Sequence, residues 1–313
     1  MKTHPPQYSL SEIGNEGEWK RLFARAAFPH MTQAWAFGEA KRRTGWRPRR
    51  MAITLDGNTV AICQVLHKCI AGIPVVARIN QGPLVLAGHE DKALSVYGVI
   101  RRHWRFLWRG PLLISPAMPD SSTATADLTS IGFKRRGRFQ WESSRLDLTR
   151  SESEIRKSLD AKWRNRLNKS EKLGLQFTSG SSQEDVNWIL EKHKENMATK
   201  GFEGASPSLL RGLYDAAPND FIVGRVTHEG EAVAGMVMFV FADVGYFYVG
   251  WFGDKGRDLS AGNYLLWNAA IELKRRGLHQ FDLGGHNGAI AFGKFKMGMN
   301  GAGYRTAGEF LAI

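Results

Sequence analysis

The sequence predicts an α/β (α+β) protein of two tandem domains, each a mixed and mostly antiparallel sheet flanked by helices. A length of 313 residues is typical of two domains. A composition of 43% hydrophobic and 23% charged residues is typical of a globular protein. One order of elements, strand, tight turn, strand, strand, helix, strand, occurs in both halves. We therefore divide the chain into residues 1–150 and 151–313 and allow the last strand to pack back on the first domain.

The first half opens with helical patterns at residues 18–27 and 32–43. Two β-rich segments then flank Asp56-Gly57-Asn58, which is a strong signal for a hairpin. The segment VVARINQGPLV reads as a strand that runs into a turn, residues 91–109 as a helix and PLLISP as a strand.

The second half repeats this order. FIVGRVTHEGEAVAGMVMFVF predicts two strands around residues 228–231, VGYFYVGWF a third, SAGNYLLWNAAIELKRRG a helix and HQFDLGG a closing strand. Residues 232–252 are apolar enough to suggest a membrane span, but Asp243 lies in their middle and β-branched and aromatic residues dominate. We predict two buried strands there. The N-terminus has no apolar signal-peptide segment, so we expect a cytoplasmic protein.

A helix over residues 152–173 is predicted between the two halves. Ser151 and Glu154 match a capping box, S-x-x-E. An apolar stripe recurs every four residues and places Trp163 in the core. The stripe consists of Ile155, Leu159, Trp163 and Leu167.

The remaining faces of this helix are basic and suit an RNA phosphate backbone, although such a face is often only solvated. The residues that we expect to bind tRNA are Lys162, Arg164, Arg166 and Lys169. The whole chain carries a net charge of 43 − 30 = +13. That surplus favours polyanionic partners such as RNA, nucleotide phosphates or, through peripheral contact, the inner face of a membrane. Cys63 and Cys69 have no metal-ligand spacing, so neither a metal site nor a disulfide is expected.

The first candidate site precedes the helix that starts near residue 260. GNAT acyltransferases, whose core order the two halves resemble, hold the pyrophosphate of acyl-CoA there on backbone amides, with the pattern Q/R-x-x-G-x-G/A. This chain has R-x-x-S-x-G, in which Ser260 replaces the central glycine. We expect Arg257 and Asn263 to bind substrate, and the alternative is an ordinary helix cap by Ser260.

The second candidate site is the segment FDLGGHNGAIAFGKFKMGMNG, in which a strand ends at Asp282 and runs into Gly284 and Gly285. Such strand ends are where α/β folds build sites, and glycines let a ligand approach the backbone. Asp282 is our first choice for a general base, with capping of the following turn as the alternative. His286 is the second titratable group in this segment.

The run Gly-Gly-x-x-G followed by Phe-Lys and a closing glycine resembles the C-terminal signature of the Fem family. LDAKWRNRLNKSEKLGLQF, FPHMTQAWAFGEAKRRTGW, NQGPLV and IGFKRR resemble further segments of that family, in order along the chain. The resemblance implies a double GNAT fold and transfer of an amino acid from aminoacyl-tRNA to a peptidoglycan precursor. It also implies that Phe295 and Lys296 line the reaction site and that a lysine of the N-terminal helix contacts a nucleotide diphosphate. Lys41 is the nearest match to that lysine, with Arg42 and Arg43 as alternatives. Lys296 would stabilise the developing oxyanion or hold an anionic group of the acceptor.

The leading expectation is therefore a Fem-type N-acyltransferase with aminoacyl-tRNA as co-substrate and no cofactor. One alternative is an N-acyltransferase that takes acyl-CoA or an acyl-carrier protein and modifies an amino sugar or polysaccharide. A second alternative is a non-enzymatic module that binds RNA or a membrane surface.

Overall fold

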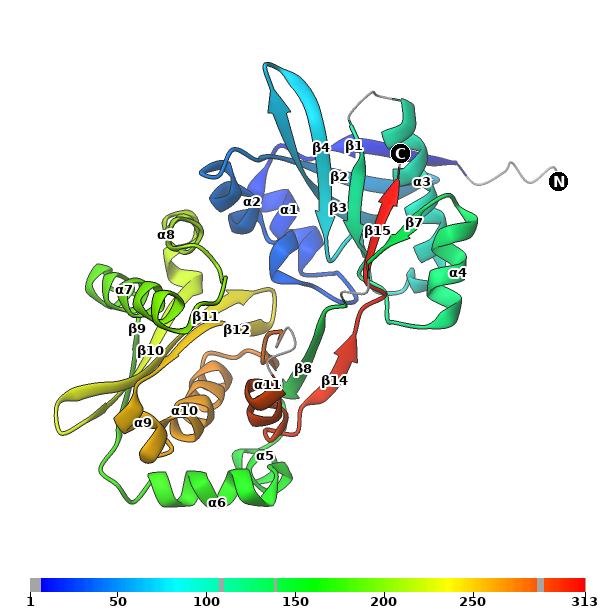
Figure 1. The fold of residues 1–313 in the computed structure, drawn as a ribbon. Coiled ribbons are helices and arrows are strands. Elements are labelled where there is room, and N and C mark those ends of the chain that lie inside the picture. The colour runs from blue at the N-terminus through cyan, green and yellow to red at the C-terminus, as the bar shows by residue number, and fades with distance from the viewer. Residues whose placement is uncertain (1–6, 107–109, 138–139, 286–289, 313) are drawn as a thin grey trace. The chain divides into compact units, whose positions relative to one another are not determined.

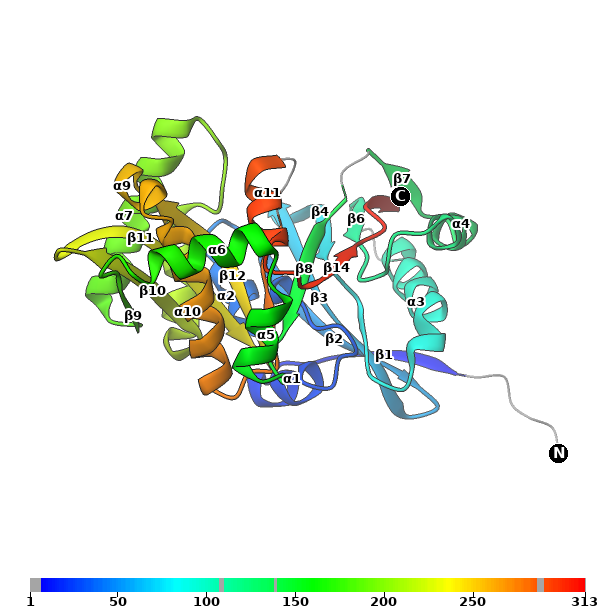
Figure 2. The ribbon, with the colours of Figure 1, turned by 90° about the horizontal axis from the view of Figure 1, so that it is seen from below.

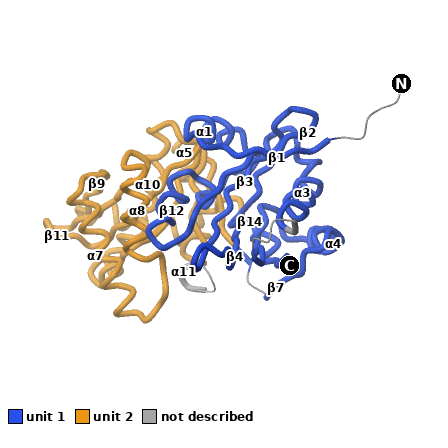
Figure 3. The backbone as a smooth tube through the Cα atoms, turned by 90° about the horizontal axis from the view of Figure 1, so that it is seen from above, with its two compact units in different colours: residues 1–141, 305–313 blue, residues 142–304 orange. Residues whose placement is uncertain are grey.

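A computed structural model describes residues 7–106, 110–137, 140–285 and 290–312 (Figure 1). The chain forms two compact units, residues 1–141 with 305–313 and residues 142–304 (Figure 3). Each unit has its own sheet, and both sheets are mixed and mostly antiparallel, as the sequence predicts. Among the described residues, no helix combines the length and the apolar character needed to cross a bilayer.

The sheet of the first unit has the strand order β1-β2-β3-β4-β6-β15-β7, with β5 beside β3. Helices α1 and α2 lie on one face of this sheet, and α3 and α4 pack on the other (Figure 1). The strands are β1 (Tyr8–Glu12), β2 (Arg47–Leu55), β3 (Asn58–Ile70), β4 (Ile73–Asn80), β5 (Leu84–Val85), β6 (Leu112–Ser115), β7 (Lys134–Arg136) and β15 (Glu309–Ala312). The helices are α1 (Glu16–Phe23), α2 (Trp35–Arg42), α3 (Ala93–Phe106) and α4 (Ser122–Ser130).

The sheet of the second unit has the order β14-β8-β13-β12-β11-β10-β9. Helices α7 and α8 lie on one face, and α10 covers the other with α6 packed along it (Figure 2). The strands are β8 (Glu142–Asp147), β9 (Gln176–Gly180), β10 (Phe221–His228), β11 (Glu231–Phe241), β12 (Val244–Phe252), β13 (Gln280–Asp282) and β14 (Ala302–Arg305). The helices are α5 (Glu152–Ser158), α6 (Ala161–Ser170), α7 (Gln183–Lys200), α8 (Pro207–Ala216), α9 (Asp254–Asp258), α10 (Ala261–Arg275) and α11 (Ile290–Met297).

The predicted hairpins and the buried strand pair are confirmed. Asp56 and Gly57 both have positive φ, of 49° and 83°, and join β2 to β3 in the tight turn that such residues favour. Residues 232–252 fall in β11 and β12, joined by a turn at 242–243. This apolar segment is therefore an antiparallel pair of strands and not a helix across a bilayer.

The prediction of one helix over residues 152–173 is wrong, because the chain breaks at Leu159 and Asp160 into α5 and α6. Leu159 adopts an extended ψ of 144°, and the carboxylate of Asp160 accepts the amide hydrogen of Trp163 and caps the new helix. The amide of Asp160 donates to the carbonyl of Gly298, 2.9 Å away. The apolar stripe survives the break, since Ile155, Leu159, Trp163 and Leu167 are all buried.

Two strands near the unit boundaries belong to a different sheet from the strand that precedes them in the chain. β8 belongs to the sheet of the second unit, so the division lies at 141–142, ahead of the strand that our boundary at 150 assigned to the first domain. The last strand, β15, runs antiparallel between β6 and β7 in the sheet of the first unit.

Phe310 on β15 provides a test of how strongly this last strand holds the first unit together. Its ring is fully buried, so Phe310→Ala should lower the free energy of unfolding by about 3–5 kcal/mol. Leu311→Ala, on the opposite and half-buried face of the same strand, should cost clearly less. Urea unfolding of both variants checks this, and equal losses would contradict the assigned register.

Candidate active site

The carboxylate of Asp282 is the most heavily hydrogen-bonded side chain of the second unit that we describe. Oδ1 accepts hydrogen bonds from Ser143 Oγ at 2.7 Å and from the amide of Gly284 at 2.9 Å. Oδ2 accepts from Arg145 Nε at 3.0 Å and from Tyr304 Oη at 2.7 Å. With four donors the carboxylate has no vacant acceptor position directed at a substrate. Asp282 therefore caps the following turn and ties β8, β13 and β14 together.

Strand pairing explains why these residues meet. Asp282 lies opposite Arg145 in the antiparallel ladder of β13 and β8, so the two side chains share one face of the sheet. Ser143, two residues before Arg145, lies on that same face. Arg145 also donates to Gln280 Oε1 at 3.1 Å. Because Asp282 is completely buried and Arg145 is 8% exposed, the pair is a buried ion pair that needs these additional donors.

Lys296 lies next to this network, on α11, and the residue is 2% exposed. Nζ donates to the carbonyl oxygens of Gly284 at 3.2 Å and Gly285 at 3.3 Å. It also lies 4.3 Å from the centre of the Phe247 ring. Burial lowers the pKa of Lys296 to about 7, and the nearby charge of Asp282 opposes that shift. The amine therefore exchanges its proton near neutral pH, which is unusual for lysine and typical of functional sites.

Gly284 allows the backbone after β13 to lie close to Phe247 of β12. Its φ is 69°, and a Cβ there would lie 2.3 Å from the carbonyl oxygen of Phe247 on β12. A larger residue would push β13 away from β12 and displace the two carbonyls that hold Lys296. The glycine pair seen in the sequence thus serves close backbone packing between two strands.

The ladder between β12 and β13 ends just before Gly284. The two strands are parallel and pair over Val244–Gln280, Gly245–Phe281 and Tyr246–Asp282, after which β12 continues to Phe252 paired with β11. Tyr246, beside Asp282, is buried, and burial together with the charge of Asp282 raises the pKa of its phenol. The phenol is therefore neutral at physiological pH and can act only as a hydrogen-bonding group.

The other residues expected to bind substrate lie apart from Lys296. The ring of Phe295 stacks on Trp163 at 6.3 Å and meets Phe252 edge-on at 6.1 Å, so it packs between α6 and β12. Asn263 is buried and donates to the carbonyl of Trp163 at 3.4 Å. Phe295 and Asn263 therefore both pack against Trp163, and their role in substrate binding stays a prediction.

The segment before α10 does not form the ordinary serine cap. Ser260 occupies the N-cap position with a positive φ of 55°, and its side chain caps no amide. Arg257 is exposed, pairs with Asp254 and donates to the carbonyl of Phe252 at 3.0 Å. Gly262 lies under two rings, because a Cβ there would be 3.1 Å from Phe295 and 3.2 Å from Phe252.

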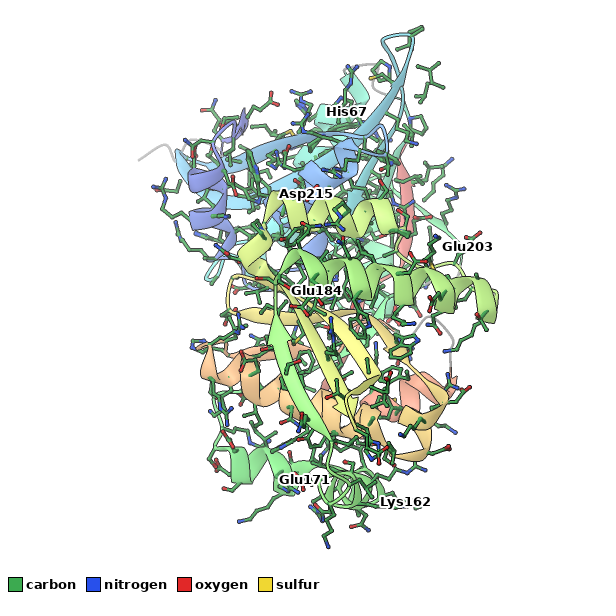
Figure 4. The ribbon with its side chains drawn as sticks, turned by 90° about the vertical axis from the view of Figure 1, so that its left-hand side faces the viewer. His67, Lys162, Glu171, Glu184, Glu203 and Asp215 are labelled. Atoms are coloured by element: carbon green, nitrogen blue, oxygen red, sulfur yellow. The ribbon has the colours of Figure 1, made fainter. Side chains whose placement is uncertain are left out.

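The basic face predicted for RNA lies on α6 (Figure 4). Lys162, Arg166 and Lys169 are exposed and make no ion pair within the described residues. Arg164 instead donates to the backbone carbonyl of Lys157 at 2.9 Å. Three of the four predicted residues therefore present unpaired charge to solvent.

Lys41 belongs to the first unit, on α2, where Nζ lies 5.5 Å from the centre of the Phe37 ring. Burial and the charges of Arg78 and Lys68 lower its pKa. Three cations, Lys41, Lys68 and Arg78, thus lie close together in the first unit. A bound anion would reduce the repulsion between their charges. His286, the other titratable residue beside the glycines, lies outside the described residues.

Sequence reasoning missed Ser143, Arg145, Tyr304 and Phe247. The alternation in the segment WESSRLDL, which places Ser143 and Arg145 two residues apart, is the signal that identifies a strand with both on one face. Nothing local indicates Tyr304 or Phe247, because each reaches the site only through strand pairing.

Asp282 provides the test of this network. Asp282→Asn leaves the buried Arg145 without a counter-charge, and we expect it to lower the free energy of unfolding by about 3–5 kcal/mol. Ser143→Ala removes one neutral donor of the same carboxylate and should cost about 1 kcal/mol. Chemical denaturation of both variants measures the difference, and equal small losses would show that the carboxylate is not the centre of the network.

Comparison with known proteins identifies the fold. Residues 157–296 match the family described as acetyltransferase (GNAT) domain. A crystal structure of FemX superposes with a TM-score of 0.82 at 16% identity, over 97% of this chain and 97% of that one. No curated protein matches the sequence.

Two further solved structures cover nearly the whole chain at lower similarity. L-PGS from Bacillus licheniformis has a TM-score of 0.58 at 13% identity, over 96% of this chain and 92% of that one. A tandem GNAT protein from the clavulanic acid biosynthesis pathway has a TM-score of 0.55 at 12% identity, over 98% of both chains. The second unit therefore contains a match to the GNAT acetyltransferase domain over residues 157–296, and the whole chain has a tandem GNAT fold similar to that of FemX.

Proposed function

We propose that the protein is a Fem-type N-acyltransferase that moves an aminoacyl group from aminoacyl-tRNA to the amine of a peptidoglycan or other cell-envelope precursor. The observation that carries the proposal is the buried ammonium group of Lys296, held by two backbone carbonyls just after the β12–β13 ladder ends. The fold similarity to FemX over 97% of both chains supports the choice of this class of transferase over other GNAT proteins.

The reaction joins the acceptor nitrogen to the ester carbonyl carbon of the donor. The carbonyl oxygen becomes an oxyanion in the tetrahedral intermediate. The C–O bond to the terminal ribose then breaks, and the ribose oxygen takes up the proton that the amine loses. The protein accelerates this sequence by stabilising the oxyanion more strongly than the starting ester.

Lys296 is the group that we assign to the oxyanion. Its ammonium carries three hydrogens, of which two are donated to Gly284 and Gly285. An oxygen that develops negative charge beside this ammonium group would accept a strong hydrogen bond, because the lysine side chain is buried. Asp282 acts through positioning: it holds the turn whose carbonyls orient Lys296. It is not our choice for the general base, because all its acceptor positions are occupied.

The exposed cations of α6 are the surface that we assign to the tRNA backbone. Lys162, Arg166 and Lys169 share one helix and lack counter-ions in the described part of the chain. Phosphates would replace condensed counter-ions there, giving salt-dependent binding without base preference. The net charge of +13 adds long-range attraction.

Use of acyl-CoA is the second candidate function. The match of residues 157–296 to an acetyltransferase domain favours it, as does the start of α10, where phosphate-binding amides lie in GNAT enzymes. Against it, Ser260 replaces a glycine and Gly262 is covered by the rings of Phe252 and Phe295. A non-enzymatic module that binds RNA remains the third candidate, favoured by the basic face of α6 alone.

Replacing Lys296 by Met keeps the side-chain volume and removes the charge. We expect transfer to fall roughly 100- to 1,000-fold, the usual effect of losing one oxyanion donor. The assay supplies a set of labelled aminoacyl-tRNAs and a soluble precursor peptide as acceptor. Lys294→Met, on the exposed face of the same helix, is the matched control and should leave turnover intact. Full activity of Lys296→Met would remove this residue from the mechanism.

The pH profile tests the charge state. Lys296 must be protonated to stabilise the oxyanion, and its pKa is lowered to about 7. The contribution of Lys296 to kcat should therefore decline as the pH rises through 7. The control variant Lys294→Met, which keeps Lys296, should show the same decline. A contribution that grows with pH through this range would indicate that neutral Lys296 acts as a base instead.

Stability should change in the opposite direction to activity. The folded pKa of about 7 lies below the ordinary value of 10.5, so the unfolded chain binds more protons between these values. The wild type therefore gains stability as the pH rises from 7 towards 10.5. Lys296→Met should be more stable than wild type at neutral pH by about 1–3 kcal/mol, after the loss of two hydrogen bonds. Urea unfolding at the two pH values measures whether this difference shrinks on the alkaline side.

Equilibrium binding distinguishes the two candidate acyl donors, aminoacyl-tRNA and acyl-CoA. Lys162→Glu combined with Arg166→Glu should weaken tRNA binding and reduce its dependence on salt. Lys194→Glu with Arg275→Glu changes the charge equally on α7 and α10 and serves as the control. Tight binding of acetyl-CoA without tRNA binding would favour the second candidate, and tRNA binding without any transfer would favour the third.

A further inference from the structure

The hairpin of β3 and β4 carries an exposed apolar tip. Residues 69–76, with the sequence CIAGIPVV, contain no charged side chain. Ile70 is 69% exposed and Ile73 is 66% exposed, and Val75 is exposed as well. Five large hydrophobic residues are strongly exposed in the described chain, and these three share one hairpin. Such a concentration marks an interaction surface, since scattered exposure is the ordinary case.

The tip projects beyond the sheet that supports it (Figure 1). Pairing of β3 with β2 ends at His67, opposite Arg47, and pairing of β4 with β6 begins at Ala77. In the described ladders, the residues between these points pair only with each other, ending at Ile70 opposite Ile73. Ala71 and Gly72 close the tip with positive φ of 49° and 80°. The result is a two-stranded ribbon with two isoleucines at its end.

Four basic side chains lie near the base of this ribbon, and we call them the basic collar. It consists of Lys41, Arg47, Lys68 and Arg78. Lys68 lies 5.1 Å from the centre of the Trp46 ring, and its charge together with that of Arg78 lowers the pKa of Lys41. Glu309 neutralises Arg78 at 2.6 Å. Arg47, Lys41 and Lys68 make no ion pair with a carboxylate in the described residues, so the collar retains net positive charge.

We propose that the β3–β4 tip is a membrane-docking element, which inserts Ile70 and Ile73 among the headgroups of an anionic lipid bilayer while the collar contacts lipid phosphates. The ribbon has the chemistry of such a contact in the right order: apolar end, tryptophan at the base and cations behind it. An apolar edge that faced only water would invite pairing with other chains. Charge complementarity selects an anionic bilayer over a second copy of this basic chain. The inference is independent of the chemistry proposed for the second unit.

Vesicle flotation tests the proposal with the whole protein. The wild type should float with vesicles of phosphatidylglycerol mixed with phosphatidylcholine and not with phosphatidylcholine alone. Binding should weaken as salt is added. Ile70→Ser combined with Ile73→Ser should reduce partition by at least about tenfold, because two apolar side chains no longer leave water. Phe202→Ser, which removes another exposed hydrophobic side chain on the second unit, should bind as the wild type does.

Two further measurements make the result decisive. Thermal unfolding of the isoleucine variant should match the wild type, since both side chains are exposed. Transfer to a soluble acceptor should also be unchanged, which separates this proposal from the one for Lys296. Failure of the wild type to float with anionic vesicles would overturn the proposal. So would equal flotation of the isoleucine variant, or conversion of a dimer to a monomer by that variant without loss of flotation.

Discussion

The buried carboxylate of Asp282 is the interaction on which the rest of the second unit's site depends. It accepts hydrogen bonds from β8, from β14 and from the turn that follows its own strand. A carboxylate with no exposed surface stays charged only when such donors and a counter-ion surround it, and Arg145 provides the counter-ion. The turn held in this way directs the carbonyls of Gly284 and Gly285 towards Lys296. Loss of the carboxylate would therefore disturb the strands and the lysine together.

Lys296, in contrast to Asp282, is a buried charge whose charged form is disfavoured by its surroundings. The Asp282–Arg145 pair is neutral as a unit, whereas the ammonium group of Lys296 is held by carbonyl dipoles and lies over the face of Phe247. Burial of an ammonium group in such surroundings is unfavourable, which is why its pKa is lowered to about 7. A fold selected for stability alone would place an apolar side chain there. The presence of a buried lysine beside the end of the β12–β13 ladder is the physical argument for function.

The two units share one plan and differ in what they expose. The second unit holds the ion pair in its sheet and Lys296 on the helix α11, and it carries a basic helix face on α6. The first unit instead extends β3 and β4 beyond their neighbours and surrounds the ribbon with cations. The same arrangement of strands therefore supports a buried chemical group in one copy and a surface for contact in the other. Divergence of this kind changes side chains and strand lengths while it keeps the ladder.

The sequence by itself determined the features that depend on near neighbours. The turn at Asp56-Gly57, the capping box of Ser151 and Glu154, the order of strands and helices, and the burial of Trp163 follow from spacing along the chain. Tertiary structure alone decided which residues surround Asp282, because Ser143 and Arg145 come from a strand more than a hundred residues away. It also broke the helix at Asp160, whose amide donates to the carbonyl of the distant Gly298. It packed the partly buried Phe295 against Trp163 and buried Lys296. The physical reason is that hairpins and caps form from contacts within a few residues, whereas burial and charge pairing arise only when separate strands meet.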